Sequence, residues 1–129
     1  MGFFDTLFGG EGEDNASSTI NWENIHSEEE LDDILMASNQ KPQVIYKHSP
    51  RCATSFFALK NLKALSAEDA RKADFYLVDV IAERSISNLV AEKLGIRHES
   101  PQLFIIKNGD VQWHGSHHQV NSDVVEGQL

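Results

Sequence analysis

Short apolar runs alternate along this chain with segments in which apolar residues recur at helical spacing. The runs at residues 43–47, 74–80 and 103–106 are rich in β-branched and aromatic side chains, which is typical of strands. Residues 56–65 and 85–94 carry apolar side chains three or four positions apart, which predicts two amphipathic helices. In the first of these helices, the spacing predicts four residues on the core side: Phe56, Leu59, Leu62 and Leu65.

The chain before the first of these runs predicts one short strand and one helix. Residues 20–22 have the composition of a short edge strand. Ser27 and Glu30 have the spacing of a capping box, in which side chains satisfy the free backbone N–H groups at the start of a helix. We expect this helix to end near residues 38–39, before Pro42 opens the next strand.

Glycines mark two further boundaries. Gly95 stands where the C-terminal cap of a helix belongs. The dipeptide Asn108-Gly109 is a strong signal for a two-residue hairpin, and the alternation over residues 110–114 predicts the partner strand. We expect one short helix within residues 119–129.

The predicted order is strand, helix, strand, helix, strand, helix and then a hairpin. Strands that alternate with helices pair in parallel through crossover connections, and the hairpin adds antiparallel strands. The sequence therefore predicts an α/β fold with a mixed central β-sheet and helices on both faces. Ligands of such sheets bind at the carboxyl ends of the strands, and Cys52 follows the strand at 43–47.

Length and composition are those of one soluble domain. The chain has 129 residues, which is enough to bury a substantial core. We expect a folded domain at residues 20–129 and a mobile N-terminal segment at residues 1–19, where polar and acidic residues follow a short apolar stretch. No apolar run approaches the roughly 18 residues of a membrane span, so we expect no membrane partner.

Charge and cysteine content narrow the class further. The formal net charge of -9 argues against a nucleic-acid partner, which would favour a basic surface. A single cysteine excludes an internal disulfide, and with no secretory signal we expect a cytoplasmic protein. Residues 1–40 contain ten of the twenty acids and no base. We interpret this as a solubilising tail and a solvated helix; the alternative is an acidic lid over the cysteine region.

The sole cysteine, Cys52, stands at the start of a predicted helix. Unpaired N–H groups and the helix dipole favour thiolate over thiol at that place, and the thiolate is the reactive form. Residues 41–67 contain no acid and five bases, namely Lys41, Lys47, Arg51, Lys60 and Lys63. Our hypothesis is that Cys52 is an accessible nucleophile whose pKa is lowered with help from Arg51 and His48. The alternative is a small buried residue, as most lone cysteines are.

Three histidines near the C-terminus, His114, His117 and His118, suggest a metal site at first sight. Zinc sites combine such histidines with cysteine or carboxylate ligands at characteristic spacing, and none is present here. We therefore expect no metal.

Three features together resemble the thioredoxin superfamily: the tetrad at 52–55, with the pattern Cys-x-x-Ser at the start of a helix, the stretch at 94–109 with Pro101, and the order of the elements. Within that superfamily, the block Lys47-His48-Ser49-x-x-Cys52-x-x-Ser55 resembles the monothiol bacilliredoxins, which are also described as bacillithiol-system redox-active proteins. The resemblance implies a thioredoxin-like fold over the domain.

The resemblance also implies a function, the removal of bacillithiol from mixed disulfides on cytosolic proteins. Cys52 would be the active thiol, and Pro101 would be a cis-proline that turns the backbone of Ser100 towards it. Bacillithiol would be a co-substrate, and no cofactor is implied. The partners would be S-thiolated client proteins and the low-molecular-weight thiol. Ser55 stands where dithiol relatives have a second cysteine, which removes resolution by an internal disulfide.

Several further residues have expected roles that depend on the resemblance. Ser55 lies one helical turn from Cys52 and either donates a hydrogen bond to the thiolate or bonds back to its own helix. Bacillithiol bears a malate-derived dicarboxylate, so nearby cations would assist its binding. The candidates are Lys47, Arg51 and Lys60.

Two other functions compete with thiol–disulfide exchange. An iron–sulfur carrier of the monothiol glutaredoxin kind also keeps one cysteine, but Ala53 and Thr54 replace the glycine and phenylalanine of its tetrad. A non-catalytic adaptor would keep the fold and bind partner peptides in the groove.

Overall fold

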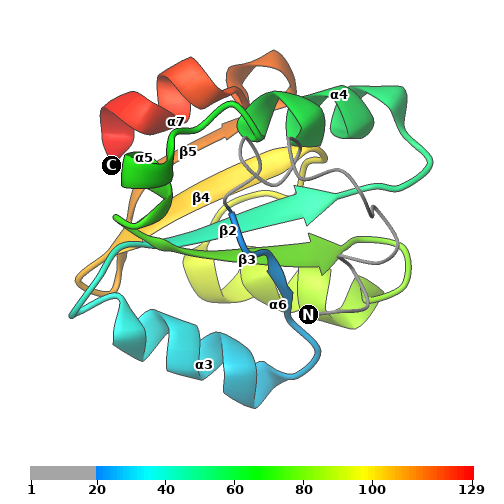
Figure 1. Cartoon of the computed structure of the whole chain (residues 1–129). Helices are drawn as coiled ribbons and strands as arrows, with labels where there is room; N and C mark the ends of the chain where they lie inside the picture. Colours follow the sequence, from blue (N-terminus) through cyan, green and yellow to red (C-terminus); the bar gives the residue numbers. More distant parts are fainter. Residues whose placement is uncertain (1–19) are drawn as a thin grey trace, which may run out of the picture.

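A five-stranded mixed sheet forms the centre of the fold in the computed structural model, which describes residues 20–129 (Figure 1). The predicted mobile segment 1–19 lies outside the described residues. The strands stand in the order β1-β3-β2-β4-β5; β1, β3 and β2 are parallel, whereas β4 is antiparallel to both β2 and β5. Their bounds are Glu23–Asn24 for β1, Gln43–His48 for β2, Asp74–Asp79 for β3, Gln102–Lys107 for β4 and Asp110–Ser116 for β5.

Helices cover both faces of this sheet (Figure 1). One face packs against α3 and α6, and the opposite face packs against α4 and α7. The bounds are Glu28–Ala37 for α3, Ala53–Leu62 for α4, Ala67–Ala70 for α5, Arg84–Leu94 for α6, His117–Gln119 for the 3₁₀ helix η1 and Ser122–Gln128 for α7. The predicted fold class, a mixed sheet between helical layers, is confirmed.

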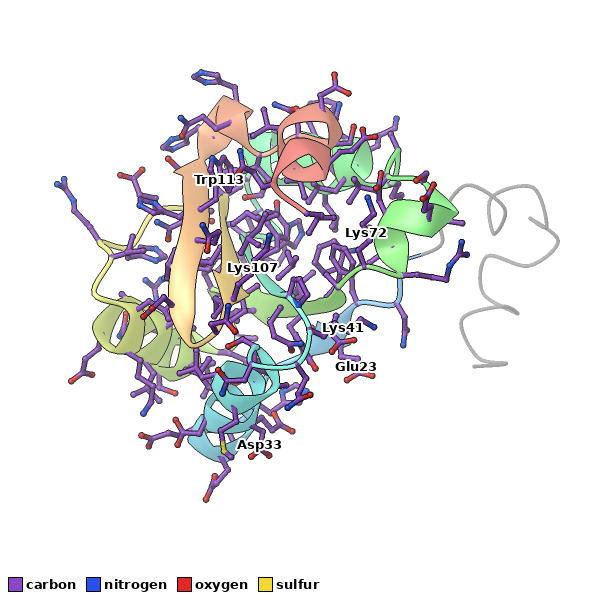
Figure 2. All side chains as sticks on the ribbon, turned by 90° about the vertical axis from the view of Figure 1, so that its left-hand side faces the viewer. Glu23, Asp33, Lys41, Lys72, Lys107 and Trp113 are labelled. Atoms are coloured by element: carbon purple, nitrogen blue, oxygen red, sulfur yellow. The ribbon has the colours of Figure 1, made fainter. Side chains whose placement is uncertain are left out.

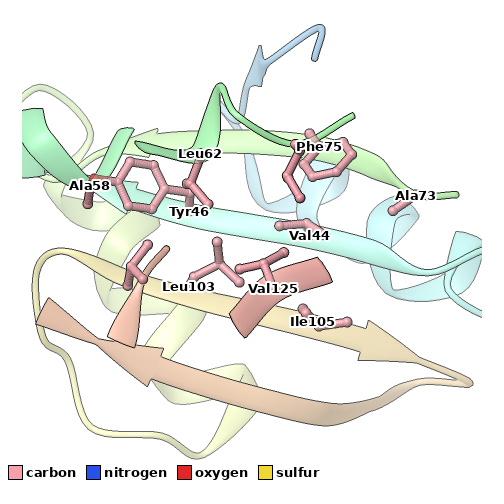
Figure 3. Packing of buried hydrophobic residues seen from close by; sticks show 11 residues of the cluster. Val44, Tyr46, Ala58, Leu62, Ala73, Phe75, Leu103, Ile105 and Val125 are labelled. Carbon is pink, nitrogen blue, oxygen red and sulfur yellow. The ribbon is translucent and has the colours of Figure 1, made fainter. Parts of the chain in front are cut away.

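Strand β2 is buried on both of its faces. Val44 and Tyr46 point into the cluster under α4 and α7, which Figure 3 shows, and Ile45 points into the cluster under α3 and α6. All three side chains are fully buried. A strand between two helical layers is expected to be apolar on both faces, which explains why its sequence reads as a continuous run.

The predicted caps at Ser27 and Gly95 and the hairpin are confirmed, but the capping box is incomplete because Glu30 does not reach the N–H of Ser27. The Ser27 hydroxyl accepts a hydrogen bond from the Glu30 N–H at 3.2 Å, and the Glu30 carboxylate accepts one from the His26 N–H at 2.6 Å. Gly95 ends α6 with a φ of 68°, a left-handed conformation that favours glycine. Asn108 and Gly109 both have positive φ, as the two central residues of a type I′ hairpin turn require.

The observed elements differ from the prediction in two places. The first strand lies at Glu23–Asn24 instead of residues 20–22, and the short helix α5 was not predicted. Helix α5 has its own N-terminal cap, because the Ser66 hydroxyl accepts a hydrogen bond from the Asp69 N–H at 3.1 Å. Four residues are too few for a periodic apolar pattern, so the sequence carried little signal for this helix.

The prediction that Phe56 faces the core is wrong, since its side chain is 56% exposed. A strict three-residue spacing turns by about 60° per step around a helix of 3.6 residues per turn, so the four residues at 56, 59, 62 and 65 do not share one face. The buried residues of α4 are Ser55, Ala58 and Leu62.

Both tryptophans are partly covered aromatics. Trp113 lies on the outermost strand β5 (Figure 2) and packs against the cluster under α4 and α7. The ring of Trp22 joins the same cluster, with its centroid 5.4 Å from that of Phe75 and 5.9 Å from that of Tyr46. Within residues 20–129, no helix combines the length and the apolar character that crossing a bilayer requires.

Two glycine-to-alanine substitutions should change stability in opposite directions. Gly95→Ala should lower the free energy of unfolding by about 1–2 kcal/mol, because alanine disfavours the left-handed φ of 68° although space for its methyl group is present. Gly127→Ala, in α7 and equally uncrowded, should raise it by about 0.5–1 kcal/mol, because glycine weakens helices. Urea unfolding measures both values. Equal effects of the two substitutions would contradict the assignment of Gly95 as a conformational cap.

Candidate active site

Cys52 is the N-cap residue of α4, and its side chain is partly exposed. The pKa of its thiol is lowered, first by a hydrogen bond from the backbone N–H of Ser55 and next by one from the backbone N–H of Thr54. These are two of the N–H groups that a helix leaves unpaired at its start. The first turn of α4 therefore favours the thiolate form of Cys52 and leaves its side chain partly exposed.

The main groups that lower the pKa of Cys52 are the backbone N–H groups at the start of α4, which are one of the two causes that the sequence suggested. Arg51 is exposed and is not among the groups that lower this pKa in the described part of the chain. Burial lowers the pKa of His48, which favours its neutral form at pH 7. Neither residue is among the groups that lower the pKa of Cys52, so the tuning of the thiolate by Arg51 and His48 stays a prediction.

Ser55 serves Cys52 through both its backbone and its side chain. The residue is fully buried, and its hydroxyl has no hydrogen-bond partner among residues 20–129. That hydroxyl and the hydroxyl of Thr54 make smaller contributions to the lowered pKa of Cys52. A buried hydroxyl without a hydrogen-bond partner is costly, and a thiolate on Cys52 would offer it an acceptor.

Tyr46 supports this turn from within the core, and the sequence analysis missed its role. Its phenol donates a hydrogen bond of 2.8 Å to the carbonyl of Ser55, and burial raises the pKa of the phenol. The Nδ1 atom of His48 lies 3.4 Å from the same phenol oxygen. A tyrosine inside a buried strand needs a partner for its hydroxyl, which is the signal that could have revealed this contact.

The peptide bond between Ser100 and Pro101 is cis, as the resemblance implied. Gln102 pairs with Lys47 across β4 and β2, so Pro101 lies across from the end of β2, where the chain turns towards Cys52. Among the described residues, neither the N–H nor the C=O of Ser100 has a backbone partner.

His117 joins the proline segment from the other side. Its N–H donates a hydrogen bond of 2.9 Å to the carbonyl of Pro101, and its Nδ1 atom lies 3.6 Å from a carboxylate oxygen of Glu99. His117 has a φ of 56°, an uncommon value for a residue other than glycine, and such values cluster at functional sites. No sequence pattern marks this conformation, so the residue was noticed only as a metal ligand candidate.

Lys47 is not the surface cation that the sequence suggested. Its side chain is fully buried on the α6 side of the sheet, and burial lowers the pKa of its ammonium to about 8. The ammonium lies 3.0 Å from Nδ1 of His98, and it stands over the ring of Phe104 at 5.8 Å from the centroid. The prediction that Lys47 binds a dissolved substrate is therefore wrong, because solvent does not reach this group.

Lys47 instead belongs to a pair of inward polar side chains that hold the segment before the cis-proline. Its neighbour Gln102 donates a hydrogen bond to the carbonyl of Arg97 and accepts one from the N–H of Glu99, at 3.0 and 3.1 Å. Lys47 contacts His98, which lies between these two residues. The two side chains together fix the approach of the chain to Pro101.

The remaining candidates lie apart from one another. Lys60 is exposed two turns along α4 from Cys52. His114 stacks on the ring of Phe104 on the opposite side of the sheet from α4. Within residues 20–129, no three histidine, cysteine or acidic side chains come together in a group that could hold a metal ion, and the expectation of no metal stays a prediction.

The sequence model of one protein family, described as "Monothiol bacilliredoxin BrxC", matches residues 23–125. The chain belongs to the monothiol bacilliredoxin family. The matched range contains Cys52 and the cis-proline segment, so the family assignment rests on the part of the chain that builds the site.

Solved structures place this bacilliredoxin among thioredoxin folds. A protein provisionally described as an oxidoreductase with a thioredoxin fold is 27% identical, with a TM-score of 0.72 over 83% of this chain and 92% of the other. Thioredoxin from Trypanosoma brucei brucei is 15% identical, with a TM-score of 0.68 over 84% of this chain and 88% of the other. A thioredoxin from Nicotiana alata is 22% identical, with a TM-score of 0.65 over 84% and 90%. The two thioredoxins share the fold.

Alkylation of Cys52 as a function of pH should separate hydrogen bonding from charge as the cause of its reactivity. We expect a midpoint below that of a free cysteine, because a lower pKa leaves more thiolate at pH 7. Ser55→Ala should raise the midpoint, and Arg51→Ala should leave it in place. A midpoint that rises in Arg51→Ala or rises with added salt would show that cations set the pKa, because salt screens their attraction to the thiolate.

The buried ammonium of Lys47 should make stability rise with pH. The unfolded chain keeps this proton up to about pH 10.5, whereas the folded protein releases it near pH 8, so the unfolded state binds more protons between these values. The free energy of unfolding of the wild type should therefore rise relative to that of Lys47→Met between pH 8 and pH 10, by roughly 3 kcal/mol at most. Urea unfolding at a series of pH values tests this, and parallel pH profiles of the two proteins would contradict it.

Proposed function

We propose that this protein removes bacillithiol from mixed disulfides on other proteins through Cys52. The observation that carries the proposal is a partly exposed sulfur at the N-terminus of α4, whose pKa the N–H groups of Ser55 and Thr54 lower. A thiolate of lowered pKa is the attacking species in thiol–disulfide exchange. Membership of the monothiol bacilliredoxin family supports bacillithiol as the thiol removed.

The first step transfers bacillithiol to the protein. The Cys52 thiolate attacks the bacillithiol sulfur of the mixed disulfide, a new sulfur–sulfur bond forms, and the bond to the client breaks. The client cysteine leaves as a thiolate with the bonding electron pair and takes a proton from solvent. The N–H groups that stabilised the charge on Cys52 no longer face a full negative charge after this step.

The second step needs another thiol, because the chain has no second cysteine to attack the adduct. The thiolate of a second bacillithiol molecule attacks the bacillithiol sulfur bound to Cys52. The products are oxidised bacillithiol and the Cys52 thiolate, which is again stabilised by the first turn of α4. Ser55 occupies the position at which dithiol relatives have a second cysteine. Its hydroxyl instead contributes to the lowered pKa of Cys52.

The surroundings of Cys52 offer groups for both halves of the substrate. The N–H and C=O of Ser100 have no backbone partner in the described residues, so they are free to pair with the extended backbone of a client. The exposed cations Arg51 and Lys60 are the candidates for the dicarboxylate of bacillithiol. The buried Lys47 is no longer a candidate for this role. Through its contact with His98 it supports the segment that leads to Ser100.

Mass spectrometry after exposure to oxidised bacillithiol should show a single adduct on Cys52, which added bacillithiol removes. Oxidised glutathione in parallel tests which thiol the site accepts. Cys52→Ser should form no adduct and should lose the activity towards client proteins. An adaptor would keep its cellular function in that variant, and an iron–sulfur carrier would be purified as a brown dimer; either result would contradict the proposal.

A second cysteine should change how the adduct is released. In the Ser55→Cys variant, the new thiol should attack Cys52, expel bacillithiol and leave an internal disulfide, without a second bacillithiol molecule. The wild-type adduct should persist until a thiol is added. If both adducts have the same lifetime in the absence of thiol, residue 55 does not lie within reach of the Cys52 sulfur.

A further inference from the structure

Two phenylalanines stand exposed in the turn of α4 that follows Cys52. Phe56 is 56% exposed and Phe57 is 62% exposed, and their rings meet edge to face with centroids 5.4 Å apart. In the described part of the chain, the other exposed large apolar side chains are Met36, on α3, and Ile81, in the turn between β3 and α6. The pair is thus the one place where two such side chains are neighbours.

The fold does not use these two rings. The inward side of α4 is formed by Ser55, Ala58 and Leu62, and the phenylalanines lie on its outward side. Exposed aromatic side chains gain free energy by burial and are over-represented at the energetic centres of protein interfaces. The packing of the domain does not explain why these two rings are exposed. A contact surface beside the reactive sulfur would explain it.

The charge around the pair indicates the chemistry of its partner. Lys60 lies four residues after Phe56 and three after Phe57, so it shares their side of the helix, and it is exposed. Arg51 is exposed just before the cysteine. Residues 41–67 contain no acid, so this surface favours an apolar side chain accompanied by acidic ones.

The size of the pair favours a transient partner. Its exposed area is roughly 240 Å², taking about 200 Å² for each whole side chain. A stable dimer buries about 800 Å² on each subunit, so the two rings fit a short segment better than a second copy of this chain.

The position of the pair fixes where that segment lies relative to the exchanging disulfide. Four to five residues of helix separate Phe56 and Phe57 from Cys52, a rise of about 6–8 Å. An extended chain covers this length in about two residues. A client side chain two positions from the thiolated cysteine therefore reaches the rings when its disulfide reaches Cys52.

We propose that Phe56, Phe57 and Lys60 form a docking surface for client polypeptides that carry an apolar side chain about two residues from the thiolated cysteine, with acidic side chains beside it. This inference rests on the proposed function, because it names the clients that Cys52 serves. It adds specificity that thiol exchange alone does not provide, since oxidised bacillithiol has no such side chain.

Peptides carrying bacillithiol on one cysteine test the docking surface. One peptide has leucine two residues from the cysteine and glutamates beyond it, and two others replace the leucine by serine or the glutamates by lysines. The measured quantity is kcat/KM for each peptide relative to kcat/KM for oxidised bacillithiol. In the wild type, this ratio should be about tenfold higher for the apolar, acidic peptide.

Variants of the full chain connect that preference to the residues. Phe56→Ser combined with Phe57→Ser should remove the preference for leucine, and Lys60→Glu should reverse the preference between glutamates and lysines. Met36→Ser removes an equally exposed apolar side chain from α3, on the other face of the sheet, and should leave every ratio unchanged. Circular dichroism checks that each variant is folded, and we expect that all are, because the altered side chains are exposed.

The outcomes separate the two proposals. Exchange at Cys52 with all peptides equally, or with the same preference in the double phenylalanine variant, overturns the docking surface and leaves the proposed function intact. No exchange with oxidised bacillithiol or with any peptide overturns the proposed function, and the docking surface falls with it. A wild type that sediments as a dimer and becomes monomeric in the double variant assigns the rings to self-association, which also overturns the docking surface.

Discussion

The hydrogen bond from the phenol of Tyr46 to the carbonyl of Ser55 connects the core of this protein to its chemistry. It joins β2 to the first turn of α4 inside the sheet-facing cluster, where no water competes for either group. Because this turn is held from below, the N–H groups of Ser55 and Thr54 are directed to one place, and Cys52 is the residue that occupies it. The reactivity of the sulfur thus depends on a buried contact that takes no part in the exchange reaction.

The other half of the site also depends on β2, through its opposite face. Lys47 and Gln102 are neighbours in the pairing of β2 with β4, and together they hold the segment that leads to Pro101. One buried strand therefore positions the helix that carries the sulfur on one side and the proline segment on the other. Burying an ammonium without a carboxylate is costly, and the lowered pKa of Lys47 is the measure of that cost.

The electrostatics of the site are local. Charges on exposed side chains such as Arg51 are screened by water and salt, whereas the short-range effect of the N–H groups at the start of α4 is screened much less. The basic composition of this region therefore has its effect at longer range, on the partners that approach. The exposed phenylalanines of α4 belong to the same outward surface.

Much of this arrangement follows from local patterns in the chain. The alternation of strands and helices, the cap at Ser27, the turn at Asn108-Gly109 and the position of Cys52 at the start of a helix depend on nearest neighbours, so the sequence determined them. Tertiary structure alone decided which side of each element meets the core. From residue type alone, a lysine is expected to be exposed and a phenylalanine to be buried. The packing of α6 over β2 nevertheless buries Lys47, and the position of Phe56 on the outward side of α4 exposes it. The contacts of Lys47 with His98 and of Tyr46 with Ser55 join positions whose proximity is set by the whole sheet, and no local pattern carries that information.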